Sequence, residues 1–186
     1  MKGFHQKQQG FCVTYLHEVV ALLAALAVVS YILYPRVQSH RYADDQVSTA
    51  HVVAERVSQK VPADQVFEVR NLGDALEKGV LTKDMLHTPG GIVGWRPSKT
   101  DGAPCTSGEN CQWYIVEWEP GAKHLCAQLA VSLVRVATQV QIGTTKFPGF
   151  SREGASSLTQ VEEKAMRQAC YDQKGATVAA VFLPHQ

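Results

Sequence analysis

The chain has 186 residues and a formal net charge of +1. This length accommodates one membrane helix and one further domain of about 120 residues with its own hydrophobic core. The near-zero net charge argues against nucleic acid as a direct ligand and against an acidic polymer as the main partner.

The strongest pattern lies near the start of the chain. A short basic leader ends at Gly10, and from Phe11 the chain enters a run that is almost wholly apolar between Val19 and Tyr34. As a helix, the run of about 24 residues is about 36 Å long, which is enough to cross a hydrocarbon core. Basic residues flank the run on both sides, so the positive-inside rule does not set its orientation.

Several kinds of targeting segment begin in this way. A secretory signal peptide has a small-x-small cleavage site after its apolar run, but here Tyr34 and Pro35 follow. A lipoprotein signal needs a cysteine after the run, whereas Cys12 precedes it. The remaining interpretations are cleavage after Gly10, which leaves the apolar helix in the mature protein, and an uncleaved signal anchor.

Beyond Pro35 the apolar residues recur at spacings of four and three. They form a narrow stripe of Ala43, Val47, Ala50, Ala54, Val57 and Val61. This stripe predicts an amphipathic continuation of the helix that stops at Pro62. A single helix over 11–61 would be about 75 Å long. Pro35 predicts a kink or local melting, because it removes one backbone donor and crowds the preceding turn.

The rest of the chain predicts an α+β head with short elements. We first expect an extended piece at 66–69, short helices near 72–79 and 82–86, and a loop at 88–110. A strand at 112–118, a helix at 125–137, a strand at 139–142 and a linking loop at 143–154 follow. The chain then predicts a helix that starts from a Thr159–Glu162 capping box, and a buried terminal strand at 176–183.

The cysteines bear on compartment and on connectivity. Cys12 lies in the apolar run, where we expect a free thiol. The four cysteines of the head are an even number, which predicts two disulfides in an oxidising space. Of the three possible pairings we favour Cys105 with Cys111, which closes a loop rich in turn residues, and Cys126 with Cys170.

No arrangement of residues points to catalysis. The seven histidines are scattered, and Cys105, Cys111, His124 and Cys126 are spaced more widely than in zinc knuckles. The glycine-rich stretch at 89–94 lacks the Lys-Ser/Thr ending of a phosphate loop. Glu117 and Glu119 alternate along a strand, as is typical of a solvated face. We therefore expect no catalytic residue, no metal and no cofactor.

A basic leader followed by Gly10, Phe11 and an apolar helix resembles the class III signal of type IV pilins and secretion pseudopilins. The order of head elements and the positions of Cys126 and Cys170 resemble type IVb pilins, in particular thin-pilus and bundle-forming pilus subunits. The segments 75–82 and 123–126 are also similar to that group. The resemblance covers nearly the whole chain.

The resemblance implies the pilin fold, in which a long spine helix packs on a small antiparallel-sheet head with disulfides. The leader would be 1–10, the membrane and assembly half of the spine 11–34, its amphipathic half 35–61, and the head 62–186. In such pilins a disulfide ties the C-terminal region to the head, and Cys126 with Cys170 matches it.

The resemblance also implies a function as a structural, non-enzymatic pilus subunit. A prepilin peptidase would cleave after Gly10 and methylate Phe11. The subunit would sit in the bacterial inner membrane with its head in the periplasm. An assembly platform would then move it into an extracellular filament of like or related pilins, of the kind that serves adhesion, conjugation or secretion. Loops 88–110 and 143–154 would form the outer surface.

One departure from the family concerns the start of the helix. The family carries a glutamate five residues into the mature chain, where this sequence has Tyr15. Glu18 lies three residues further, on nearly the same helix face, and we expect it to take over pairing with a neighbour's N-terminal amine. The departure leaves open a major, minor or tip subunit. A type II secretion pseudopilin and a signal-anchored periplasmic binding domain are the alternatives.

Overall fold

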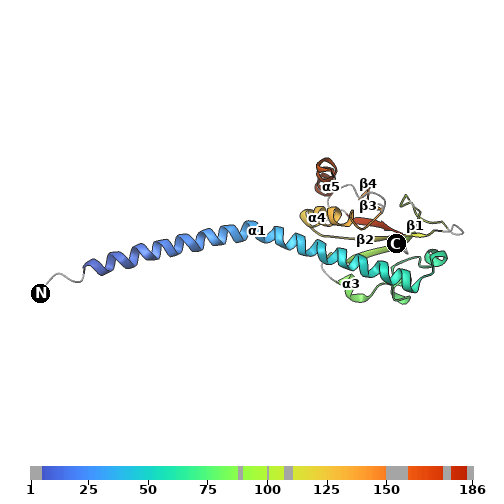
Figure 1. The fold of residues 1–186 in the computed structure, drawn as a ribbon, viewed down its shortest axis with the longest axis horizontal. Coiled ribbons are helices and arrows are strands. Elements are labelled where there is room, and N and C mark those ends of the chain that lie inside the picture. The colour runs from blue at the N-terminus through green and yellow to red at the C-terminus, as the bar shows by residue number, and fades with distance from the viewer. Residues whose placement is uncertain are drawn as a thin grey trace. The chain divides into compact units, whose positions relative to one another are not determined.

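The structure, a computed structural model, describes residues 6–87, 90–99, 101–106, 111–149, 159–173 and 177–183, without the side chains of 6–14, 63 and 87. It is an α+β protein with a long N-terminal apolar helix, a five-stranded antiparallel sheet and two disulfides (Figure 1). The chain divides into two compact units, Met1–Gln38 and Ser39–Gln186.

Helix α1, Gln6–Lys60, is continuous over 55 residues and contains Pro35. The sequence predicts a kink or local melting at Pro35; the melting does not occur, because proline removes one backbone hydrogen bond and the helix continues on both sides of it. The helix ends just before Pro62, as the sequence predicts. Its last regular contact is the bond from Val61 N to Val57 O, at 2.9 Å.

In the second unit, α1 buries a stripe whose members are Ser39, Ala43, Gln46, Ala50, Val53, Val57 and Val61. The predicted stripe was partly wrong. Val47 and Ala54 are only half-buried, and Gln46 and Val53 hold the central positions instead. A polar residue such as Gln46 is not selected by an apolar pattern, and it is buried here because it finds a hydrogen-bond donor in the sheet.

The sheet has the strand order β1-β2-β5-β3-β4, with every neighbouring pair antiparallel. The strands are β1 Ile92–Ser98, β2 Trp113–Trp118, β3 Gln139–Ile142, β4 Thr145–Pro148 and β5 Val178–Phe182. The last strand of the chain, β5, lies in the middle of the sheet and is buried at all its positions. This agrees with the near-continuous apolar run that predicted a strand buried on both sides.

Both edge strands were missed by the sequence prediction. Strand β1 lies inside the predicted loop 88–110, and β4 lies inside the predicted link 143–154. Glycine and proline made these segments look like loops, but an edge strand tolerates proline since one side of its backbone is unpaired. The segment around Gly143, with a φ of 56°, is the turn of the β3–β4 hairpin, and Thr145, Lys146 and Pro148 of β4 are exposed.

The short elements before β1 also differ in part from expectation. Residues 66–69 are not extended, because a 3₁₀ helix, η1, covers Ala63–Glu68. It starts directly at Pro62, whose carbonyl accepts from Gln65 N at 2.8 Å. The next two helices, α2 Leu72–Glu77 and α3 Lys83–His87, lie where they were expected.

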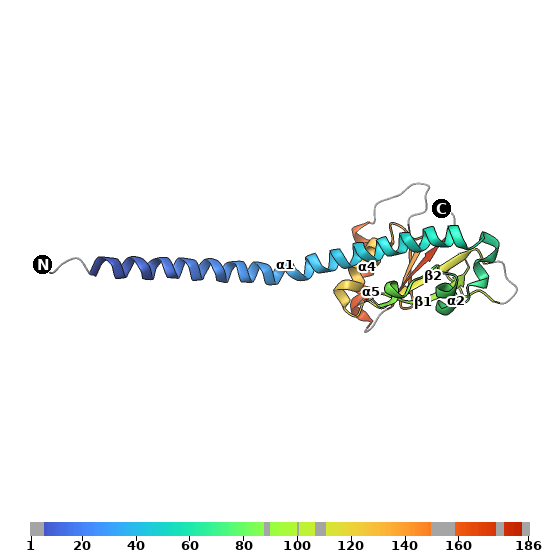
Figure 2. The same ribbon diagram turned by 90° about the horizontal axis from the view of Figure 1, so that it is seen from below.

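The two larger head helices are α4 Lys123–Leu133 and α5 Gln160–Asp172. The Thr159–Glu162 capping box is present: Thr159 N donates to Glu162 Oε2 at 3.0 Å, and Glu162 N donates to Thr159 Oγ1 at 3.3 Å. The main core lies on one face of the sheet, between β2 and β5, α4 and the Ser39–Lys60 part of α1. In both ribbon views this part of α1 runs alongside the sheet (Figures 1 and 2).

Candidate functional site

From Tyr15 to Val37, α1 exposes apolar side chains around its whole circumference. The exposed large residues are Tyr15, Leu16, Val19, Val20, Leu22, Leu23, Leu26, Val28, Val29, Tyr31, Ile32, Leu33, Tyr34 and Val37. Soluble monomers rarely expose a continuous apolar patch of this kind. Burying each such side chain is worth about 1.5–3 kcal/mol, so the surface strongly favours an apolar environment.

Within the described residues, α1 is the one helix long and apolar enough to cross a membrane. A signal sequence near an N-terminus has the same length and composition, so this feature alone indicates a membrane helix only weakly. The observation that adds to it is continuity. The apolar residues and the buried stripe of the head belong to a single uninterrupted helix.

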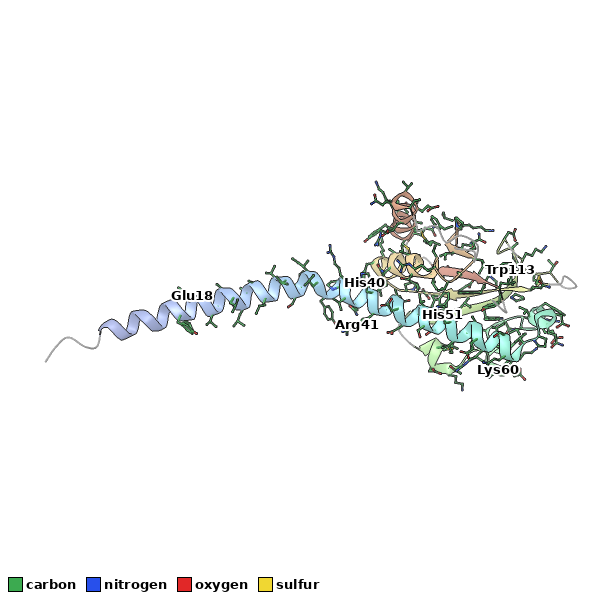
Figure 3. The ribbon with its side chains drawn as sticks, in the orientation of Figure 1. Glu18, His40, Arg41, His51, Lys60 and Trp113 are labelled. Carbon is green, nitrogen blue, oxygen red and sulfur yellow. A yellow bond between two sulfur atoms is a disulfide. The ribbon has the colours of Figure 1, made fainter. Side chains whose placement is uncertain are left out.

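The predicted assembly residues lie on this exposed part of α1. Tyr15 is 66% exposed, and Glu18 is exposed three residues further along the helix (Figure 3). Among the described residues, no cation pairs with the Glu18 carboxylate. Gly10 and Phe11 lie in the helical backbone of α1, but their side chains fall outside the described residues.

The Glu18 carboxylate is the chemically distinctive group of this surface. At the centre of a bilayer, a charged carboxylate on a helix costs about 2.5–3.5 kcal/mol, and less near the interface. A cation on a neighbouring helix would reduce that cost by direct pairing in a medium of low dielectric constant. Spacing supports a shared face with Tyr15, since residues three apart on a helix are neighbours.

The Cys126–Cys170 disulfide joins α4 to α5, with a Cα–Cα distance of 5.9 Å. Both cysteines are buried, and on α5 the other buried residue is Met166. One further contact holds the end of α5: Lys123 Nζ donates to Tyr171 O at 2.8 Å. With so few buried side chains on α5, the disulfide is the main attachment of this helix to the core.

The second disulfide, Cys105–Cys111, has a Cα–Cα distance of 6.2 Å. It connects the segment after β1 to the start of β2, close to an isolated β-bridge between Ser98 and Pro104. With Cys105, Cys111 and Cys126 in disulfides, the zinc arrangement considered from the sequence has lost its thiolate ligands.

Besides the bond between Trp118 and Gln46, three further polar contacts that the sequence did not predict hold the Ser39–Lys60 part of α1 on the head. His40 Nδ1 lies 3.1 Å from Gln128 Nε2 of α4, and Lys60 Nζ donates to Gly79 O at 2.9 Å. Between them, Tyr42 donates its hydroxyl to Gly90 O at 2.7 Å, and burial raises the pKa of this phenol. Figure 3 shows His40 and Lys60 at opposite ends of this part of the helix.

Comparison with known proteins adds no relative. No family model, no curated protein and no solved structure matches this chain.

Proposed function

We propose that this protein is a structural subunit of a type IV pilus, of the type IVb-like kind, with residues 1–10 as its leader and 11–186 as the mature pilin. The observation that carries the proposal is the difference in exposure between the two parts of α1. Its residues from Tyr15 to Val37 expose apolar side chains, whereas its residues from Ser39 onward form part of the core of a disulfide-bonded α+β head.

Such a helix suits a protein that exists in two apolar environments. Before assembly, lipid covers the side chains between Tyr15 and Val37. In the filament, the same side chains pack on equivalent helices of neighbouring copies. Because lipid and packed side chains are similarly apolar, the exchange needs little hydrophobic driving force and depends on van der Waals contact and polar pairing. Ala21 and Ala25, four residues apart, permit close approach of a neighbouring helix.

Glu18 supplies the polar pairing in this proposal. Cleavage after Gly10 creates a new α-amine on Phe11, and the carboxylate of Glu18 pairs with that amine on a neighbouring subunit. The pair sits in a largely apolar surrounding, where an unpaired carboxylate is costly. Only a neighbour whose Phe11 amine lies level with Glu18 along the helix axis can pair with this carboxylate. Tyr15 occupies the position that carries the acidic residue in the family.

The proposal places the head outside the cytoplasm, which agrees with its two disulfides. A prepilin peptidase, an inner-membrane assembly platform and other copies of the chain or related pilins are the proposed partners. The protein itself acts as a building block and not as an enzyme.

Cross-linking tests the assembly step directly. In a Cys12→Ala background, we would place two thiols on the exposed apolar surface with Leu26→Cys and Leu33→Cys, and oxidise cells that contain the assembly machinery. The two positions are seven residues apart, as Phe11 and Glu18 are, so the thiol at position 33 of one subunit would lie level with the thiol at position 26 of the neighbour that Glu18 pairs with. The proposal predicts a ladder of disulfide-linked multimers. The matched control carries the additional change Gly10→Val, which blocks the proposed cleavage and should leave monomers. Equal multimers with and without cleavage would reject the proposal in favour of an uncleaved, signal-anchored domain.

A further inference from the structure

A pocket of about 290 Å³ opens on the head. Three segments form it: η1 and its exit contribute Phe67 and Arg70, β1 contributes Arg96 and Pro97, and the chain after β1 contributes Pro104, Cys105 and Thr106. These segments all belong to the Ser39–Gln186 unit. The volume is at the lower end of the range for sites that take small molecules.

The walls of the pocket are fixed by contacts outside it. Trp95 Nε1 donates to Val69 O at 2.9 Å and so holds the chain next to Arg70 against β1. The bridge between Ser98 and Pro104 holds the opposite wall, and the Cys105–Cys111 disulfide restrains the end of that wall. The pocket is therefore built on rigid elements and largely preformed.

Two guanidinium groups dominate its charge. Among the residues that the structure describes, the lining includes Arg70 and Arg96 but no carboxylate. Arg96 Nη2 lies 3.1 Å from Glu117 Oε1, yet its Nε is buried and has no acceptor among the described residues. The Arg70 side chain makes no ion pair within the described part of the chain. Within the described part of the chain, one carboxylate, that of Glu117, pairs with one of the two arginines, so these residues give the pocket a net positive charge.

The remaining lining is apolar and suits a ring. Phe67 is 37% exposed, and Pro97 and Pro104 complete the apolar part of the lining. Aromatic and proline surfaces pack well against the flat face of a ring, while the planar fork of arginine binds carboxylates with two parallel hydrogen bonds. The combination of charge and shape selects an anion that carries a ring.

We infer that this pocket binds a small ring compound bearing one carboxylate, whose anionic group lies between Arg70 and Arg96 and whose ring lies against Phe67. Acidic sugars and aromatic acids share this chemistry. The inference concerns the head alone and does not depend on the proposed assembly of the helix.

The test is isothermal titration calorimetry on the full chain in detergent micelles at low salt. The two probes are N-acetylneuraminic acid, for the sugar source, and benzoate, for the aromatic source, each beside its uncharged methyl ester. We expect one acid to bind and its ester to bind at least about tenfold more weakly, since loss of a charge-assisted contact is worth about 1.5–3 kcal/mol. Whichever acid binds identifies the source.

Two variants connect binding to the pocket. Arg70→Gln should weaken binding of the acid by about tenfold or more, whereas Arg135→Gln, an exposed arginine outside the pocket, should leave it unchanged. Arg96 is best changed together with its partner, as Arg96→Gln with Glu117→Gln, so that no carboxylate is left unpaired. No binding of either acid at millimolar concentration, equal binding of acid and ester, or unchanged binding by Arg70→Gln would each overturn the inference.

Discussion

The indole Nε1 of Trp118 on β2 donates a hydrogen bond of 3.1 Å to Oε1 of Gln46 on α1, and both residues are almost wholly buried. The two residues are 72 positions apart in the chain. This bond ties the long helix to the sheet in the middle of the apolar core, where a missing partner would be costly. The bond adds a specific polar contact to the apolar stripe that packs α1 on the head.

Replacing Gln46 with leucine tests that bond. Gln46→Leu removes the acceptor and leaves the Trp118 N–H buried without a partner, which should lower the free energy of unfolding of the head by about 1–3 kcal/mol. Gln59→Leu on the same helix is the control, because Gln59 is exposed and contacts Glu55 on the surface. Urea unfolding of the full chain in detergent, followed by tryptophan fluorescence, gives both values. Equal midpoints for the two variants would show that the buried bond contributes nothing.

The two disulfides should differ in their effect on stability. They close loops with sequence separations of 44 and 6. In the chain-entropy model the first stabilises by about 4 kcal/mol and the second by about 2 kcal/mol. We expect Cys126→Ala with Cys170→Ala to lower the unfolding midpoint more than Cys105→Ala with Cys111→Ala. The reverse order in thermal unfolding would contradict the assignment of Cys126–Cys170 as the main attachment of α5.

The capping box of α5 predicts a defined pH dependence. Hydrogen bonds from the Thr159 backbone N–H and hydroxyl hold the pKa of Glu162 below its ordinary value of 4.5. The folded state therefore favours the carboxylate, and this contribution is complete above the unfolded pKa and is lost as the pH falls through the folded pKa.

The stability difference between the wild type and Glu162→Gln should therefore shrink as the pH is lowered from neutral to below 4.5. A Thr159→Ala background removes the hydroxyl donor to Glu162 but keeps the backbone N–H donor, and should therefore reduce this change with pH. Unfolding by urea at a series of pH values measures both. A difference that stays constant across the series would refute the role of the cap.

Glu18 should affect assembly but not membrane insertion or folding. Glu18→Gln removes the negative charge and keeps the shape, so the proposed pairing with a neighbour's α-amine is lost. In the cross-linking assay with Leu26→Cys and Leu33→Cys we expect the multimer ladder to disappear, while the chain stays in the membrane fraction with its disulfides formed. Tyr15→Phe, on nearly the same helix face, should retain the ladder. A normal multimer ladder from Glu18→Gln would show that assembly does not depend on pairing of Glu18 with a neighbour's α-amine.

Local signals in the sequence were sufficient for part of the fold. The α5 cap was predicted because Thr159 and Glu162 are three residues apart and satisfy each other. The terminal strand was predicted because it is apolar on both faces. The end of α1 was predicted because Pro62 cannot continue a helix comfortably.

Non-local pairing accounts for the elements that were missed. Strands β1 and β4 contain Gly94, Pro97 and Pro148, and they exist because β2 and β3 offer them paired edges. Gln46 was excluded from the stripe because its partner lies on a distant strand. The pocket could not be predicted from the sequence either, since Arg70 and Arg96 line one pocket only in the folded chain, where Trp95 Nε1 donates to Val69 O next to Arg70.

The most direct test of the central claim is the intact mass of the protein extracted from membranes under non-reducing conditions, with and without a co-expressed prepilin peptidase. The account predicts that only the peptidase removes residues 1–10, and that the product carries one added methyl group and the mass deficit of two disulfides. A chain that keeps its first ten residues in the presence of the active peptidase would contradict the pilin assignment and leave a membrane-anchored head domain.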